Sequence, residues 1–241
     1  MTDQGSSYAV VVVGPVQLAA GPVTIGGSVG VPEGTHWGTL GGAVSDQRGV
    51  LALTAGHVLS SGSKGGVVEQ PAQPGEGGQT EIGRVVGWSR IGRRRNTGDV
   101  GVIQLHASHS GCSQSVLASY GPEEIEGLRV SKTGAATGTT LGHVTIVDAE
   151  GVGVLYEGRR RFFDGLFAIE GHEGPFAWYG DSGSLIVPGV HQTGGSTAVG
   201  MVTAVSGATR RTLEPVCWAV ASNALSDSIR SVLRNNARTG A

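Results

Sequence analysis

The chain has 241 residues, of which 43 are glycine and only 15% are charged, and its formal net charge is -2 at pH 7. This length suits one large domain or two smaller halves that share an interface. Glycines scattered among short apolar runs indicate many turns and favour an all-β protein, and their irregular spacing excludes a collagen-like chain. The small net charge gives no general case for binding nucleic acid or an anionic membrane.

The first apolar segment is the run at residues 8–13, which ends at Gly14 and Pro15. It is short and no lysine or arginine precedes it, so we predict a β-strand rather than a signal peptide or a membrane-spanning helix. The chain has two cysteines, Cys112 and Cys217, far apart in sequence. Because secreted proteins of this size usually carry disulfides, we predict a cytoplasmic protein with two free thiols; a single disulfide is the alternative.

Short apolar strands separated by turns follow along the rest of the chain. We predict strands at residues 50–54, 82–88, 100–105, 128–132, 142–146, 167–169, 185–187 and 199–203. Residues 61–81 are predicted to be a loop rich in Gly, Pro, Gln and Ser, and the polar stretch 106–127 is predicted to connect two halves. A spacing of about 8–12 residues between strands is typical of a β-barrel or a β-sandwich.

The last segment has the periodicity of a helix. Leu225, Ile229, Val232 and Leu233 fall at i, i+4, i+7 and i+8, which is one apolar face. Asn223 or Ser226 is predicted to cap its start. We interpret this segment as a helix that packs on the barrels or sandwich and carries no function of its own.

Three short strings carry the candidate chemistry. They are Thr-Ala-Gly-His ending at His57, Gly-Asp-Val-Gly with Asp99, and Gly-Asp-Ser-Gly with Ser182. A serine hydroxyl is a poor nucleophile until a base takes its proton, and the base needs a third group to hold its tautomer. Histidine, aspartate and serine supply these three parts. Alone, the serine and aspartate strings also fit ordinary turns, and His57 also fits a histidine satisfied by local hydrogen bonds. The prediction therefore rests on the ordered set of three.

The glycines around Ser182 permit a tight turn that exposes the hydroxyl. The N–H groups of Gly180 and Ser182 are then predicted to converge on the oxygen of a substrate carbonyl, as an oxyanion hole. Asp181 is predicted to hold the turn from inside. Asp99 precedes an apolar strand, so its carboxylate needs donors, and a histidine Nδ1–H is one such donor.

The chain order His, Asp, Ser is the order of the chymotrypsin-type catalytic triad. Together with these strings it resembles the trypsin-like serine peptidases of the chymotrypsin fold. The strings at residues 53–57 and 130–134 resemble the histidine motif and the strand that opens the second barrel in bacterial members of the streptogrisin and α-lytic type. A closer similarity, to cytosolic bacterial members related to plant narrow-leaf-type peptidases, lies in the strings at residues 38–41, 70–71, 77–78 and 175–176. The resemblance covers about residues 30 to 235 and identifies the chain as a suspected member of this family.

The resemblance implies a fold and roles for residues. The fold is an all-β pair of antiparallel six-stranded β-barrels with the active site between them and a C-terminal helix. The barrels would span residues 1–110 and 128–241, with a connector at 111–127. His57 would be the general base, Asp99 its orienting carboxylate, Ser182 the nucleophile, and Gly180 with Ser182 the oxyanion hole.

The chain departs from the family pattern at two positions. Val58 follows the histidine where many secreted members have a cysteine, so the disulfide of those members is absent. Thr24 precedes the Ile-Gly-Gly string where zymogens have a basic cleavage site, so we expect an enzyme that is constitutive or controlled by a partner protein.

The segment before the serine turn lines the pocket for the P1 side chain in this family. We therefore assign Phe176, Tyr179 and Thr203 to substrate binding and predict an apolar P1 residue. Entry of Glu173 or Glu214 into the pocket is the alternative, and it would favour Arg or Lys. A role for Phe176 in the core is the competing interpretation of that ring.

Two other clusters of residues have a possible binding function. His106, His109 and Cys112 have irregular spacing and lack a fourth ligand, so a solvated linker is favoured over a zinc site. The arginines at residues 90–95 and 159–161 are interpreted as exposed hairpin tips rather than phosphate contacts. No metal or cofactor is predicted.

The predicted function is a serine endopeptidase that acts on protein or peptide substrates through an acyl-enzyme. A catalytically silent peptide-binding or scaffolding module on the same fold is the alternative. A nucleic-acid binder that uses its basic loops is a third interpretation, and neither nucleic acid nor a membrane is an expected partner.

Overall fold

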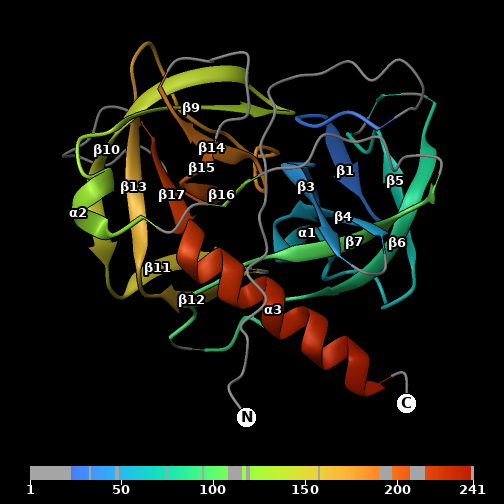
Figure 1. The fold of residues 1–241 in the computed structure, drawn as a ribbon. Coiled ribbons are helices and arrows are strands. Elements are labelled where there is room, and N and C mark those ends of the chain that lie inside the picture. Colours follow the sequence, from blue (N-terminus) through green and yellow to red (C-terminus); the bar gives the residue numbers. More distant parts are fainter. Residues whose placement is uncertain are drawn as a thin grey trace.

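The computed structural model shows a mostly β protein with two β units side by side and a helix across the front of both (Figure 1). It describes residues 23–32, 34–46, 49–73, 75–76, 78–93, 95–107, 116–117, 120–156, 158–189, 197–206 and 215–239.

The first β unit is a curled antiparallel sheet with the order β2-β1-β5-β6-β7-β4-β3. Its strands are β1 (Ser28–Gly30), β2 (Trp37–Thr39), β3 (Gly42–Asp46), β4 (Gly49–Thr54), β5 (Val67–Gln70), β6 (Thr80–Trp88) and β7 (Gly101–Leu105). The two edge strands, β2 and β3, are separated only by Leu40 and Gly41. The chain therefore bends there and passes from pairing with β1 to pairing with β4.

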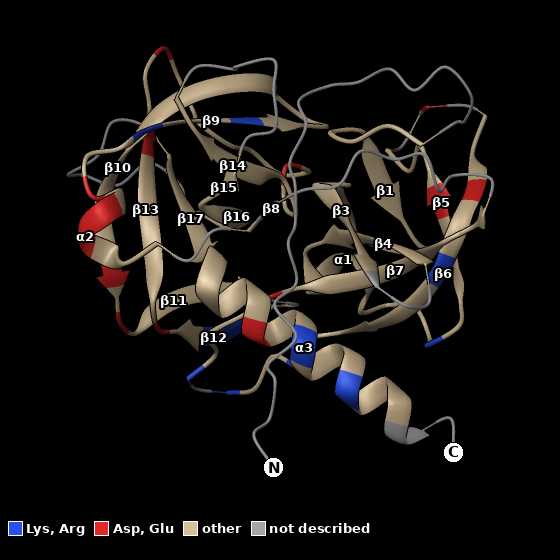
Figure 2. Cartoon of the chain, in the orientation of Figure 1, with Lys and Arg blue, Asp and Glu red and all other residues tan. Residues whose placement is uncertain are grey.

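The second β unit is a closed barrel with the order β10-β13-β17-β16-β14-β9. Its strands are β9 (Arg129–Gly134), β10 (Gly138–Ala149), β13 (Leu166–Gly171), β14 (Leu185–Pro188), β16 (Gly200–Ser206) and β17 (Val216–Ala221). The strands β14, β16 and β17 carry no charged residue and are tan in Figure 2. This is expected of barrel strands whose inward side chains fill the barrel interior.

The remaining elements lie outside the two sheets. They are α1 (Gly56–Leu59), α2 (Pro122–Ile125), α3 (Ser222–Thr239), the hairpin of β11 (Val152–Tyr156) and β12 (Arg159–Phe163), and a short parallel pair of β8 (Val116–Leu117) and β15 (Thr197–Ala198).

Each β unit has its own apolar core, and a third cluster joins them. This joining cluster takes Leu51 and Val102 from the first unit, Leu185 from the second, and the apolar face of α3. Burying a leucine or isoleucine side chain contributes about 1.5–3 kcal/mol. The α3 face thus holds the two halves in a defined relative position, and the halves form the walls of the candidate site.

The predicted fold class is confirmed, and several predicted details differ. The first unit has seven strands rather than six, because the bend at Leu40 and Gly41 divides one continuous segment. The predicted loop 61–81 contains β5, in which every second side chain is buried. This strand was not predicted because it is short and the surrounding sequence is rich in glycine. The domain boundaries stay predictions.

The apolar helix face is confirmed, since Leu225, Ile229, Val232 and Leu233 are all buried. The predicted caps are wrong. The helix begins at Ser222, and the hydroxyl of Ser226 donates to the Ser222 carbonyl from inside the first turn.

The predictions for the two cysteines and for the first strand can be compared with the structure only in part. Cys217 is a free, buried thiol. Cys112 and the predicted strand at residues 8–13 lie outside the described residues.

Candidate active site

His57 and Asp99 meet at the inner edge of the first β unit. His57 follows β4 as the second residue of α1, and Asp99 lies two residues before β7. The His57 backbone N–H donates to Asp99 Oδ1 at 3.0 Å, and its Nδ1 lies 2.7 Å from Asp99 Oδ2. A Cβ on Gly56 would lie 2.9 Å from Asp99 Oδ1, so only glycine allows this approach. The geometry leaves Nε2 of His57 as the free imidazole nitrogen.

The electrostatics of this pair favour the charged form of the histidine. Burial alone would lower the pKa of His57, but the negative charge of Asp99 and the hydrogen bond to it outweigh that effect and raise the pKa above its ordinary value. The Asp99 side chain is almost completely buried, whereas that of His57 is 21% exposed. A histidine with one buried, anchored nitrogen and partial access to the surface is suited to exchange a proton with a bound molecule.

Thr203 comes to this pair from the second β unit. Its hydroxyl, on β16, donates to Asp99 Oδ2 in a long hydrogen bond of 3.4 Å. Thr203 was predicted to bind substrate, but its hydroxyl group is hydrogen-bonded to the Asp99 carboxylate. On another side, the ring of Tyr156 lies edge-on to the His57 imidazole, with 6.0 Å between ring centroids and an interplanar angle of 88°.

The Ser182 turn has two backbone N–H groups that are not engaged. The N–H groups of Asp181, Gly183 and Ser184 donate to carbonyl oxygens at 2.9–3.0 Å. Those of Gly180 and Ser182 donate to no acceptor among the described residues. Gly180 and Gly183 both have φ of +100°, a backbone conformation that favours glycine. Two neighbouring free N–H groups at such a turn form a site for a negatively charged oxygen.

Thr39 attaches this turn to the first β unit, and the sequence analysis missed its role. Its N–H donates to the Ser182 carbonyl and its hydroxyl to the Gly180 carbonyl, both at 2.8 Å. The ring of Trp37 occupies the space where a Gly180 side chain would be. The only available signal was the Gly-Thr-Leu-Gly string at residues 38–41.

A close backbone contact brings the serine turn beside the histidine. A Cβ on Gly183 would lie 2.6 Å from Thr54 Oγ1 and 2.8 Å from the nitrogen of Ala55. Ala55 lies two residues before His57. The structure therefore gathers the predicted residues His57, Asp99, Ser182, Gly180 and Thr203 at the junction of the two β units.

A buried ion pair anchors Asp181, the residue before the serine. The Asp181 carboxylate lies 3.1 Å from Nζ of Lys132, and both side chains are fully buried. It also accepts hydrogen bonds from the N–H groups of Ala136, Thr137 and Trp178 and from the Thr137 hydroxyl. Burial lowers the pKa of Lys132, and the charge of Asp181 opposes this only in part. Sequence reasoning placed Asp181 inside the turn but gave no sign of Lys132.

The aromatic residues before the turn divide into buried and exposed. Phe176 is fully buried in the core of the second β unit, so the structure gives its ring no surface for contact with a substrate. Tyr179 is 72% exposed and Trp178 is 44% exposed. Their rings meet edge to face, with 5.6 Å between centroids. Glu173 is exposed, and Glu214 lies outside the described residues.

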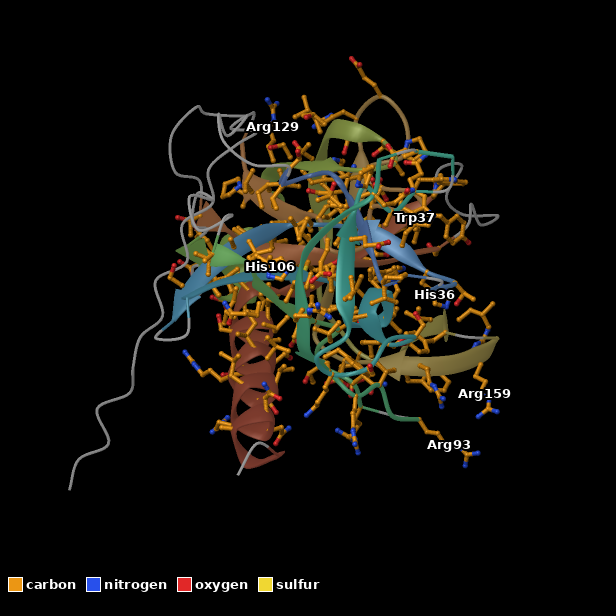
Figure 3. The ribbon with its side chains drawn as sticks, turned by 90° about the vertical axis from the view of Figure 1, so that its right-hand side faces the viewer. His36, Trp37, Arg93, His106, Arg129 and Arg159 are labelled. Atoms are coloured by element: carbon orange, nitrogen blue, oxygen red, sulfur yellow. The ribbon has the colours of Figure 1, made fainter. Side chains whose placement is uncertain are left out.

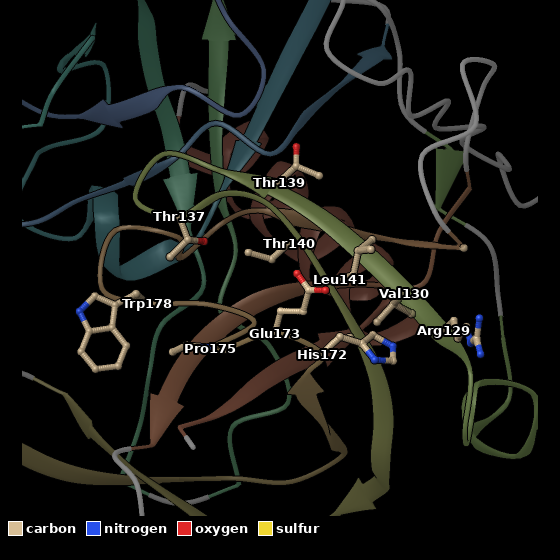
Figure 4. Close-up of a pocket in the computed structure, with 13 residues that line it drawn as sticks. Arg129, Val130, Thr137, Thr139, Thr140, Leu141, His172, Glu173, Pro175 and Trp178 are labelled. Carbon is tan, nitrogen blue, oxygen red and sulfur yellow. The ribbon is translucent and has the colours of Figure 1, made fainter. Parts of the chain in front are cut away.

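A cavity of about 850 Å³ lies between the β9–β10 turn and the segment that leads to Trp178 (Figure 4). Its walls carry threonine hydroxyls, Leu141, His172 and Glu173, and none of the triad residues. The described residues contain no cluster of His, Cys, Asp and Glu that could hold a metal ion. The Nε2 atom of His106 lies 2.8 Å from Oε1 of Glu81.

Three solved structures with a similar fold are proteases. Protease A of Thermobifida fusca has 21% sequence identity and a TM-score of 0.54, over 84% of this chain and 92% of that chain. The protease of Nocardiopsis has 20% identity and a TM-score of 0.51, over 83% and 92%. The HtrA-type protease AlgW, solved with a decapeptide, has 15% identity and a TM-score of 0.51, over 83% and 53%.

No protein-family model and no curated protein matches the sequence. At these identities the structural similarity defines the fold, which is the chymotrypsin fold of serine proteases. None of the described helices is both long and apolar enough to span a membrane.

Proposed function

We propose that the protein is a serine endopeptidase with His57 as general base, Asp99 as its orienting carboxylate and Ser182 as nucleophile. The observation that carries this proposal is the hydrogen-bonded His57–Asp99 pair beside a serine turn with two free N–H groups. The same arrangement on a chymotrypsin fold provides a base, an oriented tautomer and a site for an oxyanion.

The proposed reaction proceeds in two halves. The Ser182 hydroxyl oxygen attacks the peptide carbonyl carbon while its proton passes to His57 Nε2, and the N–H groups of Gly180 and Ser182 receive the oxyanion. The tetrahedral intermediate then releases the amine, which takes the proton from His57. Water repeats the sequence on the acyl-enzyme and frees the carboxylic acid and Ser182. Asp99 stabilises the positive imidazolium in both halves.

The substrate peptide is proposed to lie along β16. From Ala204 to Ser206 this strand pairs with β17, whereas its pairing with β14 ends at Met201. Among the described residues, the edge beyond Val202 has no strand partner, and an extended peptide can add to such an edge. We propose an apolar P1 side chain, with Tyr179 and Trp178 offering exposed aromatic surface near the turn.

We also propose that the enzyme needs no activating cleavage, because the Lys132 ammonium already neutralises Asp181 and so supports the turn. Control by a regulatory partner protein stays part of the proposal. A cytoplasmic location is proposed from the free thiol of Cys217.

Replacement of the nucleophile tests the function. Ser182→Ala should keep the fold and lower kcat by about 10⁴-fold or more, which corresponds to about 5–6 kcal/mol of transition-state stabilisation. The measurement is hydrolysis of a proteome-derived peptide library, with products identified by mass spectrometry. Hydrolysis at the wild-type rate by a clean Ser182→Ala preparation would contradict the assignment.

A silent peptide-binding module is the competing function, since the fold alone is compatible with it. A serine-reactive phosphonate distinguishes the two. An active enzyme becomes labelled on Ser182, whereas a folded protein that binds peptides and resists labelling is a binding module.

A further inference from the structure

Seven of the 17 lysine and arginine residues of the chain lie in two short segments, at residues 90–95 and 159–161. Arg93, Arg95 and Arg159 are exposed and Arg161 is half-buried; we call these four the arginine surface. Arg160 pairs with Leu155 and so lies on the other face of the hairpin. None of the four forms an ion pair with a carboxylate in the described part of the chain. Arg94, within the first segment, and Glu157, two residues before the second, lie outside the described residues.

Asn96 joins the two segments into one surface. Its side-chain oxygen accepts the Gly92 N–H at 2.7 Å, which closes the arginine loop on itself. Its side-chain nitrogen and backbone N–H both donate to the Phe162 carbonyl on β12, at 2.8 and 3.1 Å. Asn96 is 7% exposed, so this attachment is shielded from water. These hydrogen bonds therefore fix the two arginine-bearing segments beside each other.

The arginine surface adjoins the candidate active site. In Figure 3, Arg93 and Arg159 lie near each other on the same side of the molecule as Trp37, whose ring packs on Gly180 of the serine turn. Arg159 is the cross-strand partner of Tyr156, which contacts His57. Paired residues of antiparallel strands point to the same face, about 5 Å apart. One end of the surface is thus a single residue removed from the histidine.

Arg161 lies on that same face of the hairpin, because it pairs with Val154 two residues from Tyr156. Its Nε atom is buried and has no hydrogen-bond partner. A buried donor without an acceptor costs free energy, which an incoming acceptor removes. The acidic residues Asp148 and Asp164 are at the base of the hairpin, at the other end from Arg159.

We infer that the arginine surface is an extended substrate subsite that binds Asp and Glu side chains of the peptide a few residues from the cleaved bond. The inference rests on the proposed function and adds a substrate class to it. Guanidinium groups pair with carboxylates through two parallel hydrogen bonds, which gives direction as well as charge. Several arginines held close together, with no ion-paired carboxylate among the described residues, favour a segment with more than one acid.

Matched peptides test this subsite. Two peptides share one cleavable sequence, and one carries a block of Asp and Glu where the other carries Asn and Gln, placed on either side of the bond in separate pairs. For one placement we expect about 10-fold higher kcat/KM for the acidic peptide at low salt, shrinking to about 2-fold at high ionic strength. Equal kcat/KM for both members of every pair overturns the subsite and leaves the protease assignment intact.

Variants locate the effect on the surface. Arg159→Gln with Arg161→Gln should bring the preference to about 2-fold or less. Arg129→Gln is the matched control, because it removes the same charge from an exposed residue at the far end of the molecule in Figure 3, and it should keep the preference. Arg159→Glu with Arg161→Glu should invert the preference toward peptides with lysine in the block, which a merely misfolded variant cannot do.

A binding measurement separates the subsite from catalysis. Fluorescence anisotropy of labelled acidic and neutral peptides on the Ser182→Ala protein should show about 10-fold tighter binding of the acidic peptide at low salt. That result without hydrolysis by the wild type would retain the subsite and remove the protease assignment. A 20-base oligonucleotide that binds while the two peptides bind equally would overturn the inference in favour of nucleic acid.

Discussion

At the scale of single residues, the site depends on a few buried polar contacts between distant parts of the chain. Asp99 accepts hydrogen bonds from His57 on one side and from Thr203 of the other β unit. The negative charge of Asp99 and the hydrogen bond to it stabilise a positive imidazole on His57. The acid–base behaviour of His57 is therefore a property of both β units.

The pH dependence of activity follows from this pair. Neutral His57 is the proposed base, and its pKa is raised above the ordinary 6.5. Activity should therefore be low in acid, and kcat/KM should rise with pH through an apparent pKa above 6.5. Asp99→Asn removes the charge that raises this pKa, so the midpoint should move to lower pH while kcat falls by about 10⁴-fold. A midpoint that stays in place in the Asn variant would show that another group titrates.

Lys132 offers a stability test at the same scale. Lys132→Met leaves the Asp181 carboxylate buried without its counter-ion, which typically costs about 3–5 kcal/mol. Denaturant unfolding measures this loss. Lys64, the only other lysine in the sequence, is exposed, and Lys64→Met should change stability by about 0.5 kcal/mol or less. A loss of about 1 kcal/mol or less for Lys132→Met would mean that other donors satisfy Asp181.

At the scale of elements, α3 connects the two β units through one apolar face. Leu225 is fully buried in the cluster that joins them. Leu225→Ala should leave a cavity there and cost about 2–5 kcal/mol of unfolding free energy. Arg234 is exposed on the same helix, so Arg234→Ala is the control for any general effect on helicity. Equal stability of the two variants would mean that α3 does not hold the halves together.

The elements also show what the sequence could and could not predict. Strands such as β4 and β7 consist mostly of apolar residues, and the four apolar positions of α3 repeat with helical period, so local pattern suffices for them. No strand was predicted at β11 or β12, and residues 159–161 were interpreted as a hairpin tip, because three arginines stand where an apolar run would indicate a strand. Its strand character comes from pairing with a neighbour, which single-strand patterns do not contain.

The candidate site divides in the same way. The strings around His57, Asp99 and Ser182 are short and local, so the sequence predicted them together. Thr39 and Lys132 were missed because they act through contacts with residues far along the chain, such as the Thr39 bond to Gly180. Phe176 precedes the turn in sequence, but its ring packs into the barrel interior, which sequence position does not reveal.

At the scale of the whole molecule, the proposed active site exists only where the two β units meet. His57 and Asp99 belong to the first unit and Ser182 to the second, with Thr39 and Gly183 making the contacts across the junction. A site divided in this way depends on the relative position of both halves. The base and the nucleophile should then act as one unit and not as independent contributors.

A double-mutant comparison tests this dependence. His57→Ala and Ser182→Ala should each lower kcat by about 10⁴-fold or more, and the double variant should be little worse than either single variant. The physical reason is that each group is useful only with the other: the serine stays protonated without the base, and the base has no proton to take without the serine. The measurement is kcat for one peptide substrate with all four proteins, each checked for wild-type folding. Losses that multiply in the double variant would show that the two residues contribute separately, and the site would then need a different nucleophile or a different base.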